Sequence, residues 1–232
     1  MDAMQEKTYQ MSDSFLVAAL VALSGGAQDA YTFFGRGGVF ANAQTGNVVL
    51  FSSNLVRGET DAALRYLYPV IAFLLGVFAA EHIRRRFRER PGFHWRQLVV
   101  LLEIVLLTAV GFLPQTWNAL ANVLVSFVCA MQVQTFRTVC GNAYASTMCI
   151  GNLRSCMDAL HSFVDEKDAK HLRRSLIYLG VIVFFGAGAG AGYLLTQQLG
   201  DGAIWFSCAL LLCAFCMMLS GNGKNRWEEI IG

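Results

Sequence analysis

Two carboxylates stand inside apolar stretches of this chain, where an ionisable side chain needs a partner, a proton or water. Asp29 lies in residues 15–34, and Glu103 lies in residues 98–113. A charge at the depth of the lipid tails costs roughly 3 kcal/mol or more. We predict that Asp29 and Glu103 form a proton relay. The alternatives are that Asp29 caps a short helix or pairs with Arg36, and that Glu103 pairs with an arginine nearer the cytoplasm.

Two segments carry amide and hydroxyl side chains without net charge. Residues 37–56 read GGVFANAQTGNVVLFSSNLV, and residues 142–160 read NAYASTMCIGNLRSCMDAL. Such groups can replace the water shell of a small polar solute, and a helix end at a break offers N–H groups that suit an anion. Together with neighbouring polar residues they predict a substrate site of Asp29, Tyr31, Asn42, Gln44, Thr45, Asn47, Asn122, Gln134, Thr147 and Asn152. The alternative is that these side chains only satisfy the backbone of their own segments.

The two polar segments are related by a shift of 105 residues, which aligns Gly46 with Gly151 and Asn47 with Asn152. The order span, polar segment, span, span occurs twice, in residues 14–113 and in residues 117–220. Because each half would cross three times, the halves must point in opposite directions. This predicts a 3+3 inverted repeat within a single membrane domain of residues 1–232, an arrangement that places the site of transporters near the midplane.

The elements that position these residues are predicted to be membrane helices. Residues 104–136, 175–200 and 202–223 contain no Asp, Glu, Lys or Arg, and each run exceeds the roughly 20 residues that cross a bilayer as a helix. Charged residues make up 15% of the chain, against about 25% in soluble domains. The fold class is therefore an all-α polytopic membrane protein, which excludes a soluble enzyme, a nucleic-acid binder and a secreted disulfide scaffold.

Positive charges predict the orientation, since short cytoplasmic loops are rich in Lys and Arg. The basic loops at 84–96 and 167–174 are expected inside, with both chain termini. Only Arg36, Arg57 and Arg65 are then left outside. The result is about six spans plus two re-entrant or broken segments, 37–56 and 142–160, each of which begins and ends on one side.

Two helical faces carry distinctive side chains. Asn118, Asn122, Ser126 and Cys129 recur at three or four residues on one face of the segment 117–138, which either lines a pathway or joins helices. The glycines of FFGAGAGAG permit close helix contact, inside the bundle or at a homodimer seam. They are Gly186, Gly188, Gly190 and Gly192.

No nucleophile elbow, Walker loop or zinc-ligand spacing occurs in the sequence. We therefore predict no enzyme, no cofactor and no metal site, and only the lipid bilayer, a solute or ion, and a second copy as partners.

The block LSGGAQDAYTF followed by RGGVFANAQTGNVVL resembles the opening of the YoaK-like bacterial inner-membrane proteins, a domain family of unknown function. The resemblance implies an integral inner-membrane protein of about six spans, for which small-molecule transport has been suspected. It implies no particular substrate and no site residues.

The function predicted from these observations is a secondary transporter of a small polar or anionic solute, coupled to protons through Asp29. One alternative is a channel for a small solute or ion. Another is a membrane partner or assembly protein that transports nothing.

Overall fold

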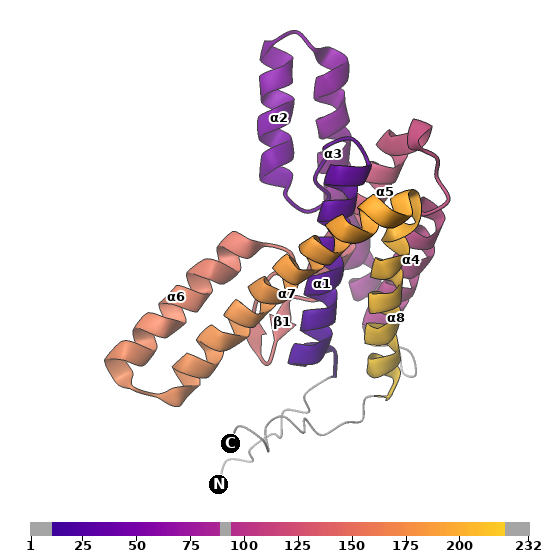
Figure 1. The fold of residues 1–232 in the computed structure, drawn as a ribbon. Coiled ribbons are helices and arrows are strands. Elements are labelled where there is room, and N and C mark those ends of the chain that lie inside the picture. The colour runs from indigo at the N-terminus through magenta and orange to yellow at the C-terminus, as the bar shows by residue number, and fades with distance from the viewer. Residues whose placement is uncertain (1–10, 89–93, 221–232) are drawn as a thin grey trace.

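The computed structural model describes residues 11–88 and 94–220, most of which lie in helices (Figure 1). The expectation that both termini are cytoplasmic falls outside these residues. The longer helices are α1 (Phe15–Ala30), α2 (Gln44–Val56), α3 (Thr60–Phe87), α4 (Trp95–Val110), α5 (Asn118–Thr135), α6 (Cys149–Glu166), α7 (Ala169–Leu199) and α8 (Trp205–Ser220). The short elements are η1 (Met11–Asp13), η2 (Tyr31–Gly35), η3 (Gln115–Trp117), η4 (Gly200–Ile204), β1 (Thr138–Val139) and β2 (Asn142–Ala143).

Helix α1 runs through the middle of the molecule (Figure 1). It begins where the Ser14 hydroxyl accepts a hydrogen bond from the backbone N–H of Val17, and it ends in the single π-turn η2. Because glycine weakens a helix, Gly25 and Gly26 predict from the sequence a helix break just before Asp29. This prediction is wrong, since the helix continues to Ala30. The glycines serve close contact instead, because a Cβ on Gly26 would overlap the carbonyl oxygen of Phe185 in α7.

Two of the four stripe glycines on α7, Gly188 and Gly192, contact α1 where the two helices cross. A Cβ on Gly188 would overlap the backbone of Leu23, and one on Gly192 would overlap the backbone of Ala27. These two glycines therefore pack inside the bundle, as one of the two predictions had it. Gly186 and Gly190 have nothing within 4 Å of such an added atom.

The crossing of α3 with α5 also depends on small residues. Ala72, Gly76 and Ala80 are spaced by four and are all buried. A Cβ on Gly76 would overlap the carbonyl oxygen of Phe127 in α5. Because small side chains let two backbones approach, van der Waals contact can hold these helices together without a large apolar interface.

Helices α2 and α3 form one hairpin and α6 and α7 form another, and the two hairpins extend away from the rest of the molecule (Figure 1). Helix α8 packs on α1, helix α4 packs on α5, and α4 and α8 pack on each other. Helix α1 packs on α7 as α5 packs on α3. If α1, α2, α3 and α4 are replaced by α5, α6, α7 and α8 respectively, and the reverse, the same set of these helix pairs results.

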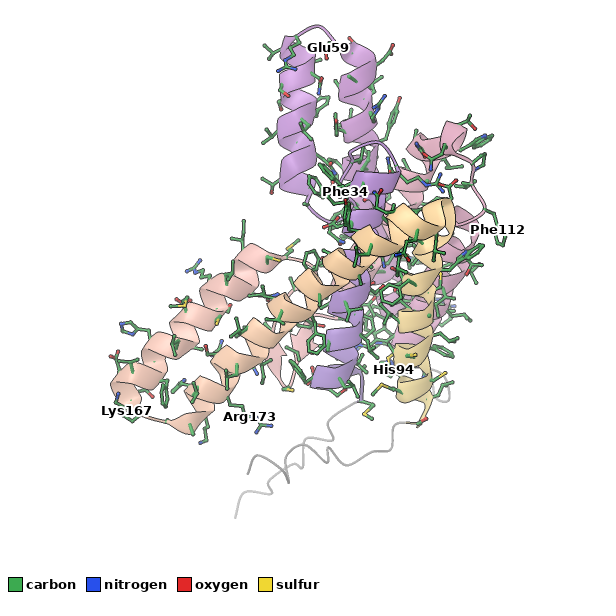
Figure 2. All side chains as sticks on the ribbon, in the orientation of Figure 1. Phe34, Glu59, His94, Phe112, Lys167 and Arg173 are labelled. Carbon is green, nitrogen blue, oxygen red and sulfur yellow. The ribbon has the colours of Figure 1, made fainter. Side chains whose placement is uncertain are left out.

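The molecule has two polar ends. At one end Arg36 donates to the carbonyl oxygen of Leu113 and forms an ion pair with Asp201. At the other end η1, the start of α4 and the β1–β2 turn meet, where Arg96 donates to Ser12. The β1–β2 ladder pairs Thr138 with Ala143 and Val139 with Asn142, and the sequence analysis did not foresee it. Figure 2 accordingly shows Phe112 and His94 at different ends.

Neither polar segment is an uninterrupted crossing helix. After Arg36 the chain turns back until Asn42 lies beside Gly25 in the middle of α1, and α2 then leads away to Glu59. In the second half, Thr147 reaches the same Gly25, and α6 then leads away to Lys167. Figure 2 shows Glu59 and Lys167 at opposite extremes of the molecule.

Three segments of the described chain are long and apolar enough to cross a membrane: Thr60–Phe87, Gln115–Thr135 and Ala169–Ser220. The protein is therefore a helical membrane protein, as its composition predicts. Many large apolar side chains on these helices are exposed, among them Phe78 and Val183, which is the pattern of a surface in contact with lipid.

Replacing Gly188 with alanine places a methyl group on the backbone of Leu23, which belongs to a helix and cannot move aside. We expect a loss of about 1–3 kcal/mol, the usual cost of overpacking. Gly190→Ala is the matched control, because its methyl group meets open space and a helix gains up to about 1 kcal/mol from this change. Thermal unfolding in detergent should place Gly188→Ala below the parent protein and Gly190→Ala at or above it. Equal melting of the two variants would contradict the assignment.

Candidate functional site

The loop before α2 is closed by the side chain of Asn47. Its Oδ1 accepts from the backbone N–H of Phe40 at 3.1 Å, and its Nδ2 donates to the carbonyl oxygen of the same residue at 2.7 Å. Gln44 assists, since its Nε2 donates to the Ala41 carbonyl oxygen and its Oε1 accepts from Asn47. Asn47 and Gln44 thus satisfy the backbone of their own segment, the alternative that the sequence left open.

The loop before α6 is closed in the same way by Asn152. Its Oδ1 accepts from the backbone N–H of Ala145 at 3.4 Å, and its Nδ2 donates to the Ala145 carbonyl oxygen at 2.7 Å. The pair Ala145 and Asn152 lies 105 residues after the pair Phe40 and Asn47. The shift that aligned two asparagines in the sequence therefore also aligns one hydrogen-bond pattern in space.

Both loops reach Gly25 of α1. The Nδ2 of Asn42 donates to the Gly25 carbonyl oxygen at 3.1 Å, and the methyl group of Thr147 packs against the Cα of Gly25. Only a residue without a Cβ leaves room for Thr147 here. Asn42 Oδ1 and Thr147 Oγ1 are buried and have no hydrogen-bond partner among the described residues. Such orphaned atoms are rare in folded proteins, so this junction is a candidate site.

Asp29 lies one turn further along α1. Its Oδ1 accepts from the backbone N–H of Asn42 at 2.7 Å, and the amides of Ala41 and Ala43 also face the carboxylate. Since Ala43 is the N-cap residue of α2, Asp29 stabilises the start of that helix. The capping alternative is therefore present in the structure, whereas Arg36 pairs with Asp201 rather than with Asp29.

The polar stripe of α5 joins this helix to α1 and the loop after it. Asn122 donates to the carbonyl oxygen of Arg36, and Cys129 donates to the Oε1 of Gln28. Gln132 donates to the Val21 carbonyl oxygen and accepts from Gln28. Gln132 therefore belongs to the junction at Gly25, where its Nε2 would lie 3.4 Å from an added Cβ, and Cys129 is joined to it through Gln28.

Glu103 in α4 is completely buried, and neither of its carboxylate oxygens has a hydrogen-bond partner in the described residues. The ion pair with the basic loop is therefore not formed by any arginine that the structure describes. Ser126 of α5 is also buried with an unpartnered hydroxyl. The Cys129 thiol lies within electrostatic reach of both Asp29 and Glu103, the two carboxylates of the predicted relay.

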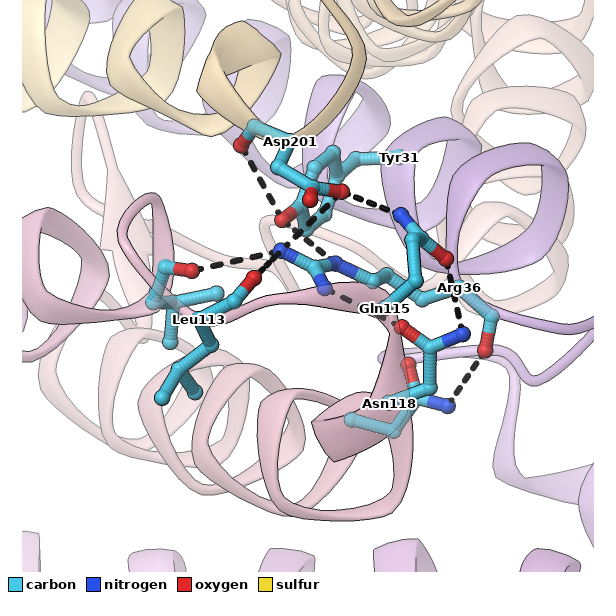
Figure 3. A network of polar contacts seen from close by, with 8 residues as sticks. Tyr31, Arg36, Leu113, Gln115, Asn118 and Asp201 are labelled. Carbon is cyan, nitrogen blue, oxygen red and sulfur yellow. Dashed lines mark hydrogen bonds and ion pairs between the residues drawn. The ribbon is translucent and has the colours of Figure 1, made fainter.

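Arg36 forms a second polar centre at the end of α1 (Figure 3). The side chain is fully buried, and its guanidinium pairs with Asp201 at 3.3 Å. Tyr31 accepts from the Nε of Arg36 and donates to the Asp201 carbonyl oxygen. The remaining acceptors of the guanidinium are Asn118 Oδ1 and the carbonyl oxygens of Val110 and Leu113. Gln115 links Asn118 to the Asp201 carboxylate.

The predicted site residues thus fall into separate groups. Asp29, Asn42 and Thr147 meet at Gly25, whereas Tyr31 and Asn122 contact Arg36. Thr45 is exposed. Gln134 donates to Glu81 of α3 and is not part of the junction at Gly25. The shift of 105 residues also aligns Asp29 with Gln134, but Asp29 contacts the loop before α2 whereas Gln134 contacts α3.

Gln28, Gln132 and Asp201 are absent from the set of site residues predicted from the sequence, although Asp201 contacts Tyr31 of that set. Gln28 precedes Asp29 in an apolar helix, which is the signal that could have included it. Asp201 lies in a short loop between two helices, where a carboxylate is ordinary, so no local pattern connects it with Arg36 across 165 residues.

A family model described as "Protein of unknown function (DUF1275)" matches residues 17–217. The chain belongs to this family. Searches of curated proteins and of solved structures found no match to the chain. The match to DUF1275 includes both loops, Asp29, Glu103 and the Arg36 centre, so every group described above lies within the part of the chain that defines the family.

We expect Arg36→Met to destabilise this DUF1275 protein strongly. The substitution leaves the Tyr31 hydroxyl and the Val110 and Leu113 carbonyl oxygens without their donor, and Asp201 without its counter-charge. A buried acceptor left unpaired costs about 1–3 kcal/mol, whereas the Asp201 side chain is 31% exposed and stays partly hydrated. Several unpaired acceptors together correspond to roughly 10 °C in melting temperature for a chain of this size.

The matched control is Arg57→Met, because Arg57 is exposed at the end of α2. Melting in detergent measures both variants. If Arg36→Met had the same melting temperature as Arg57→Met, the Arg36 centre would not be required for stability.

Proposed function

We propose that this protein is a secondary transporter of a small polar or anionic solute in the bacterial inner membrane. One observation carries the proposal: two loops, each closed by an asparagine and each starting from a different end of the molecule, reach the same glycine in the middle of α1. Non-helical backbone at membrane depth is tolerated only where it is enclosed by protein or lines a wet cavity. Paired loops of this kind give a transporter a central site that can open toward either side.

The proposal includes a 3+3 inverted repeat of residues 14–113 and 117–220, with six spans and two re-entrant segments. The exchange of α1–α4 with α5–α8 supports it, because this exchange preserves the helix pairings. The repeat is also supported by Asn47 and Asn152, which close their two loops with the same hydrogen-bond pattern. Helices α3 and α7, with 28 and 31 residues, are long enough to cross a bilayer with tilt.

In this proposal the solute binds between Asn42 and Thr147, whose orphaned oxygen atoms are available to it. Asp29 connects that site to the hydrogen-bonded start of α2, so a change in its charge would alter the loop that contacts the solute. Cys129 and Glu103 extend the route toward α4. Because Cys129 lies within electrostatic reach of both carboxylates, the proposal includes proton coupling through Asp29 and Glu103. No enzymatic step, metal or cofactor is part of the proposal.

The resemblance to YoaK-like inner-membrane proteins over residues 25–50 agrees with this location and covers the loop around Asn42. A channel is the second candidate, since two loops that meet in the middle can also form a pore. The side chains at Gly25 are buried and packed against α1, which favours a carrier with a closed centre over a continuously open pore. Gly186 and Gly190 remain available for contact with a second copy.

Topology can be tested by single cysteines in a protein from which the native cysteines have been removed. Cysteines introduced in place of Glu59 and Glu166 should react with an impermeant maleimide from opposite sides of the membrane. The cysteine at position 59 should react in intact cells, and the one at position 166 only in inverted vesicles. The reason is that each position lies at the free tip of one of the two hairpins. Labelling of both positions from one side would contradict the inverted repeat.

Transport can be tested in proteoliposomes with labelled phosphate, hydrogencarbonate and lactate. We expect saturable counterflow of at least one of them, as for a carrier. Asp29→Asn keeps an oxygen that accepts from Asn42 but removes the charge, so it should abolish proton-driven uptake. Glu59→Gln is the control, because Glu59 is an exposed carboxylate at the hairpin tip.

Flux that rises linearly with concentration and shows no counterflow would favour the channel. Uptake by Asp29→Asn equal to that of the parent protein would remove Asp29 from the mechanism.

A further inference from the structure

A cavity of about 300 Å³ lies beside the Arg36 centre. It is separate from the junction at Gly25 and is reached from the end of the molecule where the links before α5 and α8 lie. Its polar lining consists of Arg36, Arg65, Gln115, Thr116, Asn118 and Asn122. The volume is at the lower end of the range for ligand pockets, so it suits a small molecule.

The charge of the cavity is positive. Asp201 neutralises Arg36 but does not line the cavity. Arg65 of α3 is exposed and takes part in no ion pair within the described residues. The lining thus contains one uncompensated positive charge and no carboxylate, which a single negative charge on a ligand would balance.

The hydrogen-bonding groups that remain free define the ligand further. Arg36 has five N–H groups, and its hydrogen bonds leave one N–H on Nη1 without an acceptor among the described residues. Asn118 uses both ends of its amide, toward Arg36 and Gln115.

Asn122 presents the opposite kind of group. The residue is 2% exposed, its Nδ2 donates to the Arg36 carbonyl oxygen, and its Oδ1 has no partner in the described chain. The amide orientation is fixed, because only the Nδ2 can donate to that carbonyl oxygen. An anion with oxygen acceptors alone would leave Oδ1 unsatisfied, which is costly for a buried atom.

We propose that this cavity is a binding site for a small monovalent oxyanion that carries its own O–H or N–H donor, such as a hydroxycarboxylate, hydrogencarbonate or dihydrogenphosphate. The negative group lies against Arg65 and the free N–H of Arg36, and the donor points to Asn122 Oδ1. This inference rests on the proposed transport function, for which it names the substrate class. Asn122 belongs to the polar stripe of α5, which continues through Ser126 and Cys129 toward the junction at Gly25.

Binding to the full-length protein in detergent tests the site without requiring transport. Titration calorimetry would compare lactate with propionate, which has the same carboxylate but no hydroxyl, and would include hydrogencarbonate, dihydrogenphosphate and chloride. We expect at least one of the three donor-bearing anions to bind about tenfold or more tightly than propionate and chloride. Arg65→Gln should weaken that binding about tenfold or more, because it removes the uncompensated charge.

Arg57→Gln is the matched control: Arg57 is an exposed arginine at the far end of α2 and does not line the cavity. Because Arg65 is also exposed, its substitution should leave the melting temperature unchanged. The proposal would be overturned if no donor-bearing anion bound, if none of them bound more tightly than propionate, or if the two arginine variants had equal affinity for the anion that does bind. Anion binding without counterflow would overturn the transporter alone, and counterflow unaffected by Arg65→Gln would overturn this site alone.

Discussion

A backbone group that leaves helical pairing in apolar surroundings must find another hydrogen-bond partner, and the centre of this protein depends on how that requirement is met. Asn47 and Asn152 each return both ends of their amide to the backbone of a residue seven positions earlier. A loop closed in this way can lie in the interior, because a side chain of the same segment pairs with its backbone groups. The chain can therefore bring two irregular segments to Gly25, where a continuous helix would present only its side chains.

Helix α1 is the structure against which those loops are placed. Its glycines do not interrupt the helix. Gly26 lets the α7 backbone approach closely, and Gly25 leaves room for the Thr147 side chain. Its far end is held by Arg36, whose guanidinium connects the loop after η2 with the links before α5 and α8. Close packing along the helix and the hydrogen-bonded guanidinium at its end keep α1 in one position, so both loops have a fixed surface to meet.

The two polar centres differ in what they leave open. At Gly25 the free groups are an amide oxygen and a hydroxyl beside the Asp29 carboxylate, while the cavity next to Arg36 offers positive charge and one acceptor. The polar face of α5 runs from one centre to the other.

The sequence by itself determined the membrane helices, the two exceptional segments and their relation by 105 residues, because hydropathy, charge and spacing are local properties of the chain. It also predicted that Asp29, Asn42 and Thr147 belong together, and the structure brings them close to one another beside Gly25. Only the tertiary structure decided that Gly25 and Gly26 stay helical, that Asn47 and Asn152 close loops, that Gln134 turns to Glu81, and that Arg36 pairs with Asp201. Each of these outcomes depends on which backbone or side chain arrives from a distant part of the chain, and no local pattern specifies that neighbour.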